Sequence, residues 1–256
     1  MTLFDLTGKT CLVTGSTKGI GEAIVHRLAE HGANVVVSSR KADACEKVAG
    51  DINAKYGKGK TVAAAIPCNI NYKEQLQALV DATRKTFGKI DVLICNAALN
   101  PYYGPMAEMP DDAFDKVMAA NVRSNHWLCQ MVLPEMVERK DGSIVIVSSI
   151  GGLRGSPVIG AYCISKAADM QLARNLAVEY GPHGIRANCI APGLIKTDFA
   201  RALWENPETL KRSTAGAALR RIGEPDEIAG AAVFLASKAG AFTTGQTFVI
   251  DGGALA

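Results

Sequence analysis

The sequence has no marked excess of charge of either sign, and histidine is rare. It contains 28 basic and 25 acidic residues among 256, a formal net charge of +3 that is too balanced to indicate binding to nucleic acid or to an anionic membrane. The four histidines are scattered along the chain, and no two cysteines have the spacing of metal ligands. We therefore expect no nucleic-acid partner, no membrane partner and no metal site.

Long apolar runs and paired cysteines are also missing. No segment reaches the roughly 18 apolar residues of a membrane span, and the amino-terminal stretch MTLFDLTGKT lacks the apolar core of a signal peptide. The seven cysteines stand singly among apolar neighbours, as small buried hydrophobic residues do in a reducing compartment. These absences favour a cytoplasmic protein.

The sequence does contain a regular alternation of short apolar runs and longer segments with helical spacing. The apolar runs are 10–14, 34–39, 61–66, 91–95, 143–149, 185–191 and 246–250. Runs without polar alternation, separated by helices, are typical of a parallel sheet covered on both faces. The pattern predicts an α/β fold, a single Rossmann-type doubly wound domain over residues 1–256, with about seven parallel strands and helices on both faces.

One segment, 194–218, interrupts this alternation and reads as an insertion with one or two short helices. Ligands of doubly wound folds bind beyond the carboxyl ends of the strands. Because the segment follows the sixth predicted strand, we expect it to lie over the substrate crevice.

The first predicted strand runs into a glycine-rich loop, TGSTKGIG, at residues 14–21. Glycines allow a tight turn and a close backbone approach, and the following helix start offers N–H groups to a pyrophosphate. The spacing GxxxGxG differs from the GxGxxG fingerprint, but its place after the first strand indicates dinucleotide binding. The predicted cofactor-binding residues of the loop are Gly15, Ser16, Thr17, Lys18, Gly19, Ile20 and Gly21.

The end of the second predicted strand bears on the choice of dinucleotide. It reads Ser-Ser-Arg-Lys over residues 38–41, with no acid before Asp43. A carboxylate there would bond the ribose hydroxyls of NAD, whereas an arginine can bind the 2′-phosphate of NADP. We predict NADP(H), with Ser39 and Arg40 among its contacts and Lys18 reaching the same phosphate. The alternative is that these basic residues are only a solvated helix start.

A tyrosine and a lysine, Tyr162 and Lys166, stand one helical turn apart in the stretch GAYCISKAA. Ser149, thirteen residues upstream of the tyrosine, ends the apolar run IVIVSS. Taken alone, the pair reads as a solvated surface contact. Together with a dinucleotide loop, it favours a proton donor with a cation beside it, because a cation stabilises the phenolate and lowers a phenol pKa from about 10.

Six motifs occur in one order along the chain, and they resemble the short-chain dehydrogenase/reductase family over nearly its whole length. They are TGSTKGIG, NAA at 96–98, Asn121, Ser149, YCISK at 162–166 and APGLIKT at 191–197. The stretches NAALNPYYGP and APGLIKTDFARALW are similar to those of NADP-dependent carbonyl reductases that reduce retinal and diketones. Reductases of 3-oxoacyl thioesters share most of the same motifs.

The resemblance implies a role for each catalytic candidate. Tyr162 would donate a proton to the carbonyl oxygen, and Lys166 would lower the tyrosine pKa and hold the nicotinamide ribose. Ser149 would hydrogen-bond the substrate oxygen, and Asn121 would hold a water in a proton relay behind Lys166. Besides Tyr162 and Lys166, the implied cofactor contacts are Asn69 (where the family usually has aspartate), Ile70, Asn96, Ala97, Pro192, Gly193, Ile195 and Thr197.

The implied activity is NADPH-dependent reduction of a ketone or aldehyde to an alcohol, in a homotetramer that pairs helices near 111–138 and 160–181. Three aromatic residues, Tyr102, Tyr103 and Trp204, are expected to line a pocket for a small-molecule substrate with apolar substituents. Loop packing is the alternative for the two tyrosines.

Other functions stay open at this point. One is a reductase of 3-oxoacyl thioesters on acyl carrier protein or coenzyme A, although Lys140 and His183 stand where such enzymes tend to carry arginines. A sugar or polyol dehydrogenase is another. A redox-sensing dinucleotide-binding protein without turnover is a third, and the intact Ser149, Tyr162 and Lys166 argue against it.

Overall fold

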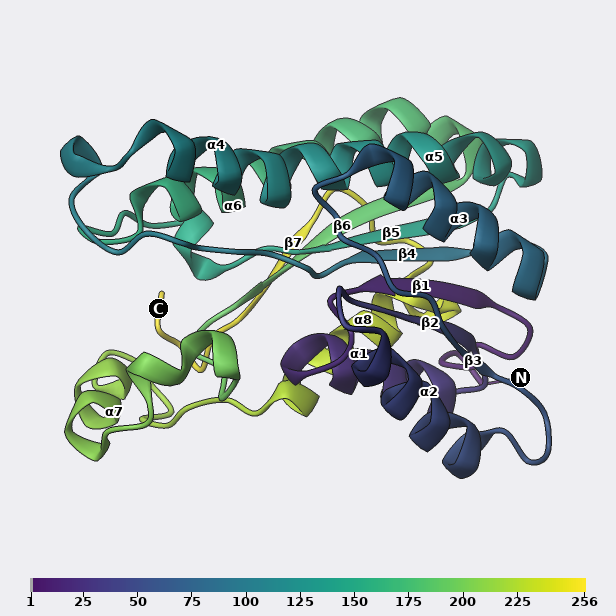
Figure 1. Ribbon diagram of the computed structural model, residues 1–256, viewed down its shortest axis with the longest axis horizontal. Helices are drawn as coiled ribbons and strands as arrows, with labels where there is room; N and C mark the ends of the chain where they lie inside the picture. The colour runs from purple at the N-terminus through teal and green to yellow at the C-terminus, as the bar shows by residue number, and fades with distance from the viewer. Residues whose placement is uncertain (1) are drawn as a thin grey trace.

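Seven parallel strands form one sheet in the computed structural model, which describes residues 2–256 (Figure 1). Their order is β3-β2-β1-β4-β5-β6-β7. The strands are β1 (Thr10–Thr14), β2 (Asn34–Ser38), β3 (Ala63–Ala65), β4 (Val92–Cys95), β5 (Gly142–Val147), β6 (Ile185–Pro192) and β7 (Thr247–Ile250). Each lies within or beside one of the predicted apolar runs, and every pairing is parallel, so the predicted Rossmann-type α/β fold is confirmed.

Helices cover both faces of the sheet. They are α1 (Gly19–Glu30), α2 (Ala42–Tyr56), α3 (Lys73–Phe87), α4 (Asp111–Met118), α5 (Ser124–Arg139), α6 (Gly160–Tyr180), α7 (Pro207–Thr214) and α8 (Pro225–Ala236). In Figure 1, α3, α5 and α6 lie above the sheet, and α1, α2 and α8 lie below it. Within residues 2–256, none of the helices has the length and apolar composition of a transmembrane segment.

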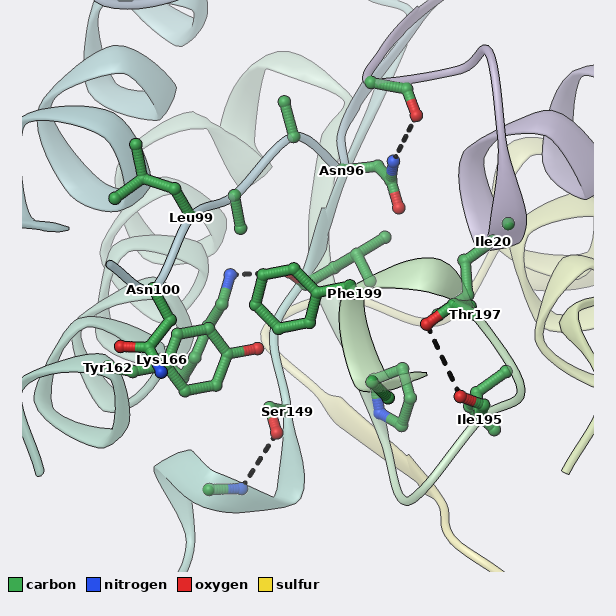
Figure 2. A pocket seen from close by; sticks show the side chains of 18 of the residues that line it. Ile20, Asn96, Leu99, Asn100, Ser149, Tyr162, Lys166, Ile195, Thr197 and Phe199 are labelled. Atoms are coloured by element: carbon green, nitrogen blue, oxygen red, sulfur yellow. Dashed lines mark hydrogen bonds between the residues drawn. The ribbon is translucent and has the colours of Figure 1, made fainter. Parts of the chain in front are cut away.

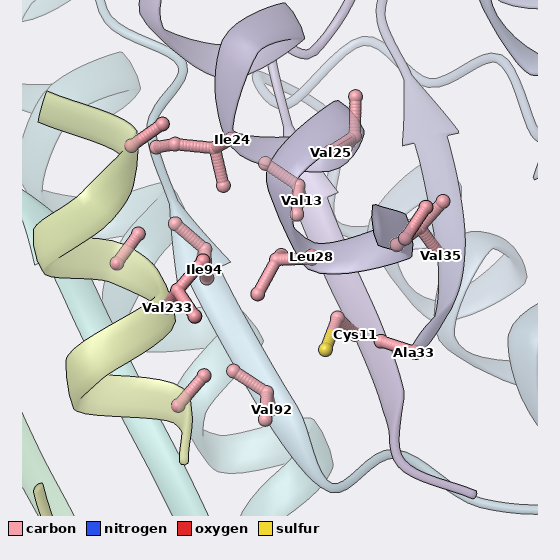
Figure 3. Packing of buried hydrophobic residues seen from close by; sticks show 14 of the residues in the cluster. Cys11, Val13, Ile24, Val25, Leu28, Ala33, Val35, Val92, Ile94 and Val233 are labelled. Atoms are coloured by element: carbon pink, nitrogen blue, oxygen red, sulfur yellow. The ribbon is translucent and has the colours of Figure 1, made fainter. Parts of the chain in front are cut away.

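The strand pleat divides the core into two hydrophobic clusters, one on each face. In β4, Val92 and Ile94 belong to the cluster between the sheet and helices α1 and α8. Leu93 and Cys95 belong to the cluster between the sheet and helices α3, α5 and α6. Figure 3 shows the first cluster, where side chains of α1 and α8 meet those of β1 and β4. Because successive strand residues point to opposite faces, an apolar run without alternation fills both clusters.

The segment predicted as one helix near 111–138 is interrupted by a π-helical stretch, η2 (Ala119–Arg123). One extra residue per turn rotates the side chains that follow, and such stretches are frequent at functional sites. Asn121 lies in this stretch and is fully buried. The interruption therefore turns Asn121 toward the interior, which helical periodicity alone did not predict.

Short 3₁₀ segments connect the larger elements. They are η1 (Met106–Glu108), η3 (Ile150–Gly152), η4 (Gly181–His183), η5 (Asp198–Leu203) and η6 (Lys238–Gly240). The segment between β6 and α8 contains η5 and α7, which stand apart from the sheet in Figure 1.

Replacement of Leu28 tests the packing of α1 on the sheet. Leu28 is fully buried in the first cluster, so Leu28→Ala removes apolar contacts and leaves a cavity. We expect a loss of about 2–5 kcal/mol in the free energy of unfolding, measured by urea denaturation. As a control, Leu3→Ala makes the same change at a side chain that is 65% exposed and is expected to stay within about 0.5 kcal/mol. Equal effects of the two substitutions would contradict this packing.

Candidate active site

A pocket of about 850 Å³ lies along the carboxyl ends of the strands. It is lined by residues that follow β1, β2, β3, β4, β5 and β6, together with the start of α6 and part of η5. Figure 2 shows side chains from these loops facing one space. The strand order reverses between β1 and β4, and a crevice at such a reversal is where doubly wound folds bind ligands.

The glycine loop can accommodate a phosphate group because its glycines have no side chains to block the backbone. Gly19 has φ +58°, a left-handed conformation that favours glycine. A Cβ on Gly21 would lie 2.3 Å from the Gly15 carbonyl oxygen and 2.5 Å from Asn96 Nδ2. No side chain caps the start of α1 at Lys18, so its first N–H groups stay available at the pocket wall. A pyrophosphate is the ligand that such a helix start accommodates.

Ser16 is the exception among the predicted loop residues. Its side chain is fully buried and does not line the pocket. The Ser16 hydroxyl donates to the Val13 carbonyl at 2.8 Å and accepts from the Ser38 N–H at 2.9 Å. Ser16 therefore joins the ends of β1 and β2, because a buried hydroxyl takes the nearest backbone partners.

Basic residues line one end of the pocket, as expected, and they come from the end of β2 and from the glycine loop. Ser39, Arg40 and Lys18 all line it, whereas Lys41 does not. Lys18 Nζ lies 3.3 Å from Asp198 Oδ2 in an exposed pair that bridges the glycine loop and η5. Arg40 is exposed and forms no salt bridge within residues 2–256, so its guanidinium is available to an anionic ligand.

Asn96 clamps the two strand ends that flank the crevice. Its Nδ2 donates to the carbonyl oxygens of Thr14 and Gly15, each at 3.0 Å. The Thr14 hydroxyl accepts from the N–H groups of Asn96 and Ala97, both at 3.1 Å. Asn96 and Ala97 also line the pocket, as do Asn69 and Ile70 beyond β3.

The segment after β6 forms the opposite wall. Pro192, Gly193, Ile195 and Thr197 line the pocket as predicted. The Thr197 hydroxyl donates to the Ile195 carbonyl at 3.4 Å, a long bond that leaves this hydroxyl available to a ligand (Figure 2).

Ser149, Tyr162 and Lys166 meet at the pocket wall between η3 and α6 (Figure 2). Lys166 Nζ lies 5.7 Å from the centre of the Tyr162 ring. The Ser149 hydroxyl accepts from the Gly151 N–H at 3.0 Å, which orients it and leaves its proton free to donate. The structure thus brings the three predicted residues together beside the glycine loop.

The electrostatics of Tyr162 differ from the sequence-based expectation. Its enclosed position raises the pKa of the Tyr162 phenol, while Lys166 and then Ser149 lower it. Lys166 acts in the expected direction, but burial outweighs it and the pKa lies above its usual value. That the lysine brings this pKa down toward neutrality when the cofactor is bound stays a prediction.

Asn121 is close to this group but does not line the pocket. Its Oδ1 accepts from the Leu99 N–H at 2.9 Å, and its Nδ2 donates to the Leu99 carbonyl at 3.0 Å. The same amide donates to the Ser165 hydroxyl at 3.0 Å. Asn121 therefore fixes the loop after β4 against α6, which places Leu99 on the pocket wall.

Two of the three aromatic residues expected at the substrate end do not line this pocket. Tyr103 lines the pocket, but Tyr102 does not, and its hydroxyl donates to the Pro105 carbonyl at 3.1 Å. The indole N–H of Trp204 donates to the Thr197 carbonyl at 2.8 Å, which holds the ring in a separate depression between α1 and α8. The aromatic that faces Tyr162 is Phe199, with ring centres 5.8 Å apart.

Sequence reasoning missed Phe199 although the stretch DFARALW was noted, because an aromatic residue carries no signal of which side of a short helix it occupies. Within residues 2–256, no group of three His, Cys, Asp or Glu side chains is arranged to hold a metal ion.

Comparison with known proteins agrees with this fold. The family model described as Enoyl-(Acyl carrier protein) reductase matches residues 15–254. The chain is 42% identical over 250 residues to dehydrogenase/reductase SDR family member 4 of Bos taurus, covering 98% of this chain and 88% of that protein. It is 41% identical to the Homo sapiens protein of the same name over 248 residues, covering 97% and 88%.

A solved structure has the same architecture. A gluconate 5-dehydrogenase from Burkholderia cenocepacia, in complex with NADP and tartrate, superposes with a TM-score of 0.92 at 30% identity, covering 99% of this chain and 97% of that chain. The fold and the pocket thus define an oxidoreductase with a nicotinamide dinucleotide cofactor. The chain belongs to the short-chain dehydrogenase/reductase family, whose members act on CH–OH groups with NAD(P).

Substitution of Gly21 tests the phosphate-binding loop. Gly21→Ala forces a Cβ against the Gly15 carbonyl, so we expect nicotinamide dinucleotide binding to fall at least tenfold, measured by fluorescence titration with NADPH. Gly50→Ala is the matched control, because a Cβ at Gly50 on α2 meets no atom within 4 Å. Unchanged binding by Gly21→Ala would show that the loop does not hold the cofactor as described.

Proposed function

We propose that the protein is an NADPH-dependent reductase that converts a ketone or aldehyde to an alcohol, with Tyr162 as the proton donor. The observation that carries the proposal is the meeting of Ser149, Tyr162 and Lys166 on the wall of a pocket that also contains the bare start of α1. A dinucleotide anchored at that start would have the pocket available as far as Tyr162. Catalytic groups and cofactor then share one enclosed space.

Each side chain has a distinct task in the proposed reaction. The nicotinamide, when bound, supplies a hydride to the carbonyl carbon. Ser149 donates a hydrogen bond to the carbonyl oxygen, where negative charge develops. Tyr162 gives its proton to that oxygen, so the alcohol leaves neutral and a phenolate remains. Lys166 stabilises the phenolate by its charge. Asn121 fixes the loop after β4 and would hold a water in a proton relay behind Lys166.

A raised pKa of Tyr162 suits reduction, because the phenol then stays protonated and able to donate over the neutral range. In the reverse reaction the phenolate must form. The positive charge of an oxidised nicotinamide, when bound, would favour it. The free protein therefore presents Tyr162 to a carbonyl substrate as a neutral phenol.

The preference for NADP(H) over NAD(H) rests on Arg40. Its guanidinium is exposed at the pocket edge beside Ser39 and has no salt-bridge partner within residues 2–256. Lys18 approaches the same end from the glycine loop and can exchange its exposed Asp198 partner for a phosphate. The gluconate 5-dehydrogenase that resembles this chain is complexed with NADP, and a similar 7α-hydroxysteroid dehydrogenase with NADH.

The lining of the pocket near Tyr162 supports carbonyl substrates with apolar substituents. It includes Leu99, Val158, Phe199 and Leu203, with Tyr103 at the rim. A 3-oxoacyl thioester, on acyl carrier protein or coenzyme A, is the second candidate, because an acyl chain fits the same apolar wall. A sugar or polyol substrate is third, since few of these side chains can bond several hydroxyls.

The proposal takes the whole chain as one catalytic domain, with residues 194–218 closing over the substrate. It places the protein in a reducing compartment such as the cytoplasm, which its seven free cysteines support. A homotetramer is also proposed. Helix α6 supports it by exposing Ile164 and Val178, which are 45% and 81% accessible.

Removal of the Arg40 side chain tests the cofactor preference. Arg40→Ala deletes the charge proposed to bind the 2′-phosphate, so we expect NADPH binding to weaken by roughly 10- to 100-fold while NADH binding is unchanged. Lys41→Ala is the matched control, because Lys41 carries the same charge next to Arg40 but does not line the pocket. Parallel weakening of both nucleotides in Arg40→Ala would argue against selectivity at this residue.

Substitution of the proton donor tests the reaction. Tyr162→Phe keeps the ring and removes the hydroxyl, so we expect kcat for an apolar diketone or aryl ketone to fall by roughly 10²- to 10⁴-fold with NADPH binding retained. Tyr102→Phe, which loses a hydroxyl outside the pocket, should leave kcat unchanged. A 3-oxoacyl thioester and a polyol are assayed in parallel. If the wild type reduces the thioester or oxidises the polyol faster than it reduces the ketone, the protein belongs to that substrate class instead. Full activity in Tyr162→Phe would refute the mechanism.

A further inference from the structure

A carboxylate lies directly behind the lysine of the site. Asp169 follows Lys166 by three positions on α6 and is fully buried. Its Oδ2 lies 2.9 Å from Lys166 Nζ, and its Oδ1 accepts from Asn125 Nδ2 on α5 at 2.9 Å. A buried carboxylate is costly unless it is paired and hydrogen-bonded, and both oxygens of Asp169 meet this requirement.

The contacts of Asp169 continue toward the π-helical stretch. Asn125 Nδ2 also donates to the Asn121 carbonyl oxygen at 2.6 Å, so one amide bridges Asn121 and Asp169. The backbone carbonyl of Asp169 accepts from the Cys189 thiol at 3.4 Å. Asn125 on α5 thus holds the carboxylate, while η2 positions Asn125 and β6 contacts the Asp169 backbone.

This arrangement fixes where the ammonium points. An ammonium has three donors. Lys166 uses one toward the Val147 carbonyl at 3.0 Å and one toward Asp169 at 2.9 Å. The third has no protein partner within residues 2–256, and Lys166 lines the pocket. Two inward bonds therefore leave one donor for the pocket side, beneath the Tyr162 ring.

We propose that Asp169 is a positioning residue of the active site. It holds the Lys166 ammonium beneath Tyr162, and its negative charge offsets the field of that ammonium at the tyrosine hydroxyl. The inference rests on the proposed function, because it concerns the same proton donor. It differs from the roles assigned above, since Asp169 does not line the pocket: it bonds Lys166 directly and reaches the tyrosine hydroxyl through its charge.

The other titratable groups around the pair do not compete with Asp169. Cys95 on β4 and Cys189 on β6 are the cysteines near enough to feel the charges of Lys166 and Asp169. Contact with Cys129 and burial both raise the pKa of Cys95, and burial raises the pKa of Cys189, so these two stay neutral. Cys163, next to Tyr162 on α6, is also kept neutral because burial raises its pKa.

The signs of the charge effects are consistent with this role. Burial disfavours the ammonium of Lys166, but Asp169 and Tyr162 more than compensate and raise the pKa of Lys166. For Tyr162, Lys166 lowers the pKa and Asp169 raises it. In Asp169→Asn the amide oxygen can still accept from Lys166 Nζ, as the Val147 carbonyl does, so the ammonium keeps its place while the opposing charge is lost. The phenol should then meet the undiminished field of Lys166 and ionise at lower pH.

The test is a spectroscopic titration that needs no turnover. The ultraviolet absorbance change of phenolate formation is followed against pH for Asp169→Asn and for the wild type, without cofactor. Subtraction of the matching Tyr162→Phe protein isolates the Tyr162 signal in each background. Asp169→Asn keeps the size and polarity of the side chain, and we expect the Tyr162 midpoint to move down by roughly one pH unit. An unchanged or higher midpoint would overturn the proposal.

Two controls make the result specific. Asp112→Asn removes an exposed carboxylate paired with Lys116 on α4, outside the pocket, and should leave the Tyr162 midpoint unchanged. If Asp169→Asn does not fold, as judged by circular dichroism, Asp169→Ser removes the same charge from a smaller side chain and carries the same expected shift.

Activity separates this inference from the proposed function. With NADPH and a ketone, Asp169→Asn should lose reduction at a lower pH than the wild type, because the phenol loses its proton earlier. A uniform fall in kcat without a change in the pH profile would indicate a purely structural role and would contradict the inference. Absence of turnover in the wild type would refute the proposed function alone, since the titration does not depend on it.

Discussion

The site depends on the hydrogen bonds that join the carboxyl ends of β1 and β4, where the strand order of the sheet reverses. Thr14 and Asn96 bond each other's backbone in both directions, and Asn96 also holds the Gly15 carbonyl. The chain leaves these two strands toward opposite halves of the sheet, so a crevice opens between them. The bare start of α1 lies on one side of it and the Tyr162 group on the other, which gives a dinucleotide a path between them.

The chemical end of the pocket combines charge with burial. Lys166 and Asp169 are almost fully enclosed and lie 2.9 Å apart, which allows a cation to be kept next to Tyr162 without exposure to water. Burial alone would favour a neutral lysine and a neutral phenol. The carboxylate keeps the lysine charged, while the lysine limits how far burial raises the tyrosine pKa. The state of the proton donor is thus set by three groups on one helix.

Much of this could be predicted from the sequence, because strands buried on both faces read as uninterrupted apolar runs and parallel strands end at one edge. The residues after each run therefore converged, as Arg40, Asn96 and Ser149 do. The sequence did not predict which way individual side chains point. Ser16 turns inward, and Trp204 is held away from the pocket by a backbone carbonyl. Asp169 was not singled out, because its spacing of three from Lys166 is also that of a solvated surface pair and its second partner, Asn125, lies on another helix.

The central claim is that this pocket transfers a hydride between a nicotinamide and a carbonyl carbon. Incubation with NADPH carrying deuterium at the transferable position of the nicotinamide, followed by mass spectrometry of the alcohol, tests it directly. The account predicts one deuterium on the carbinol carbon when one face of the nicotinamide is labelled and none when the other face is labelled. An alcohol without deuterium from either labelled cofactor would contradict direct hydride transfer in this pocket.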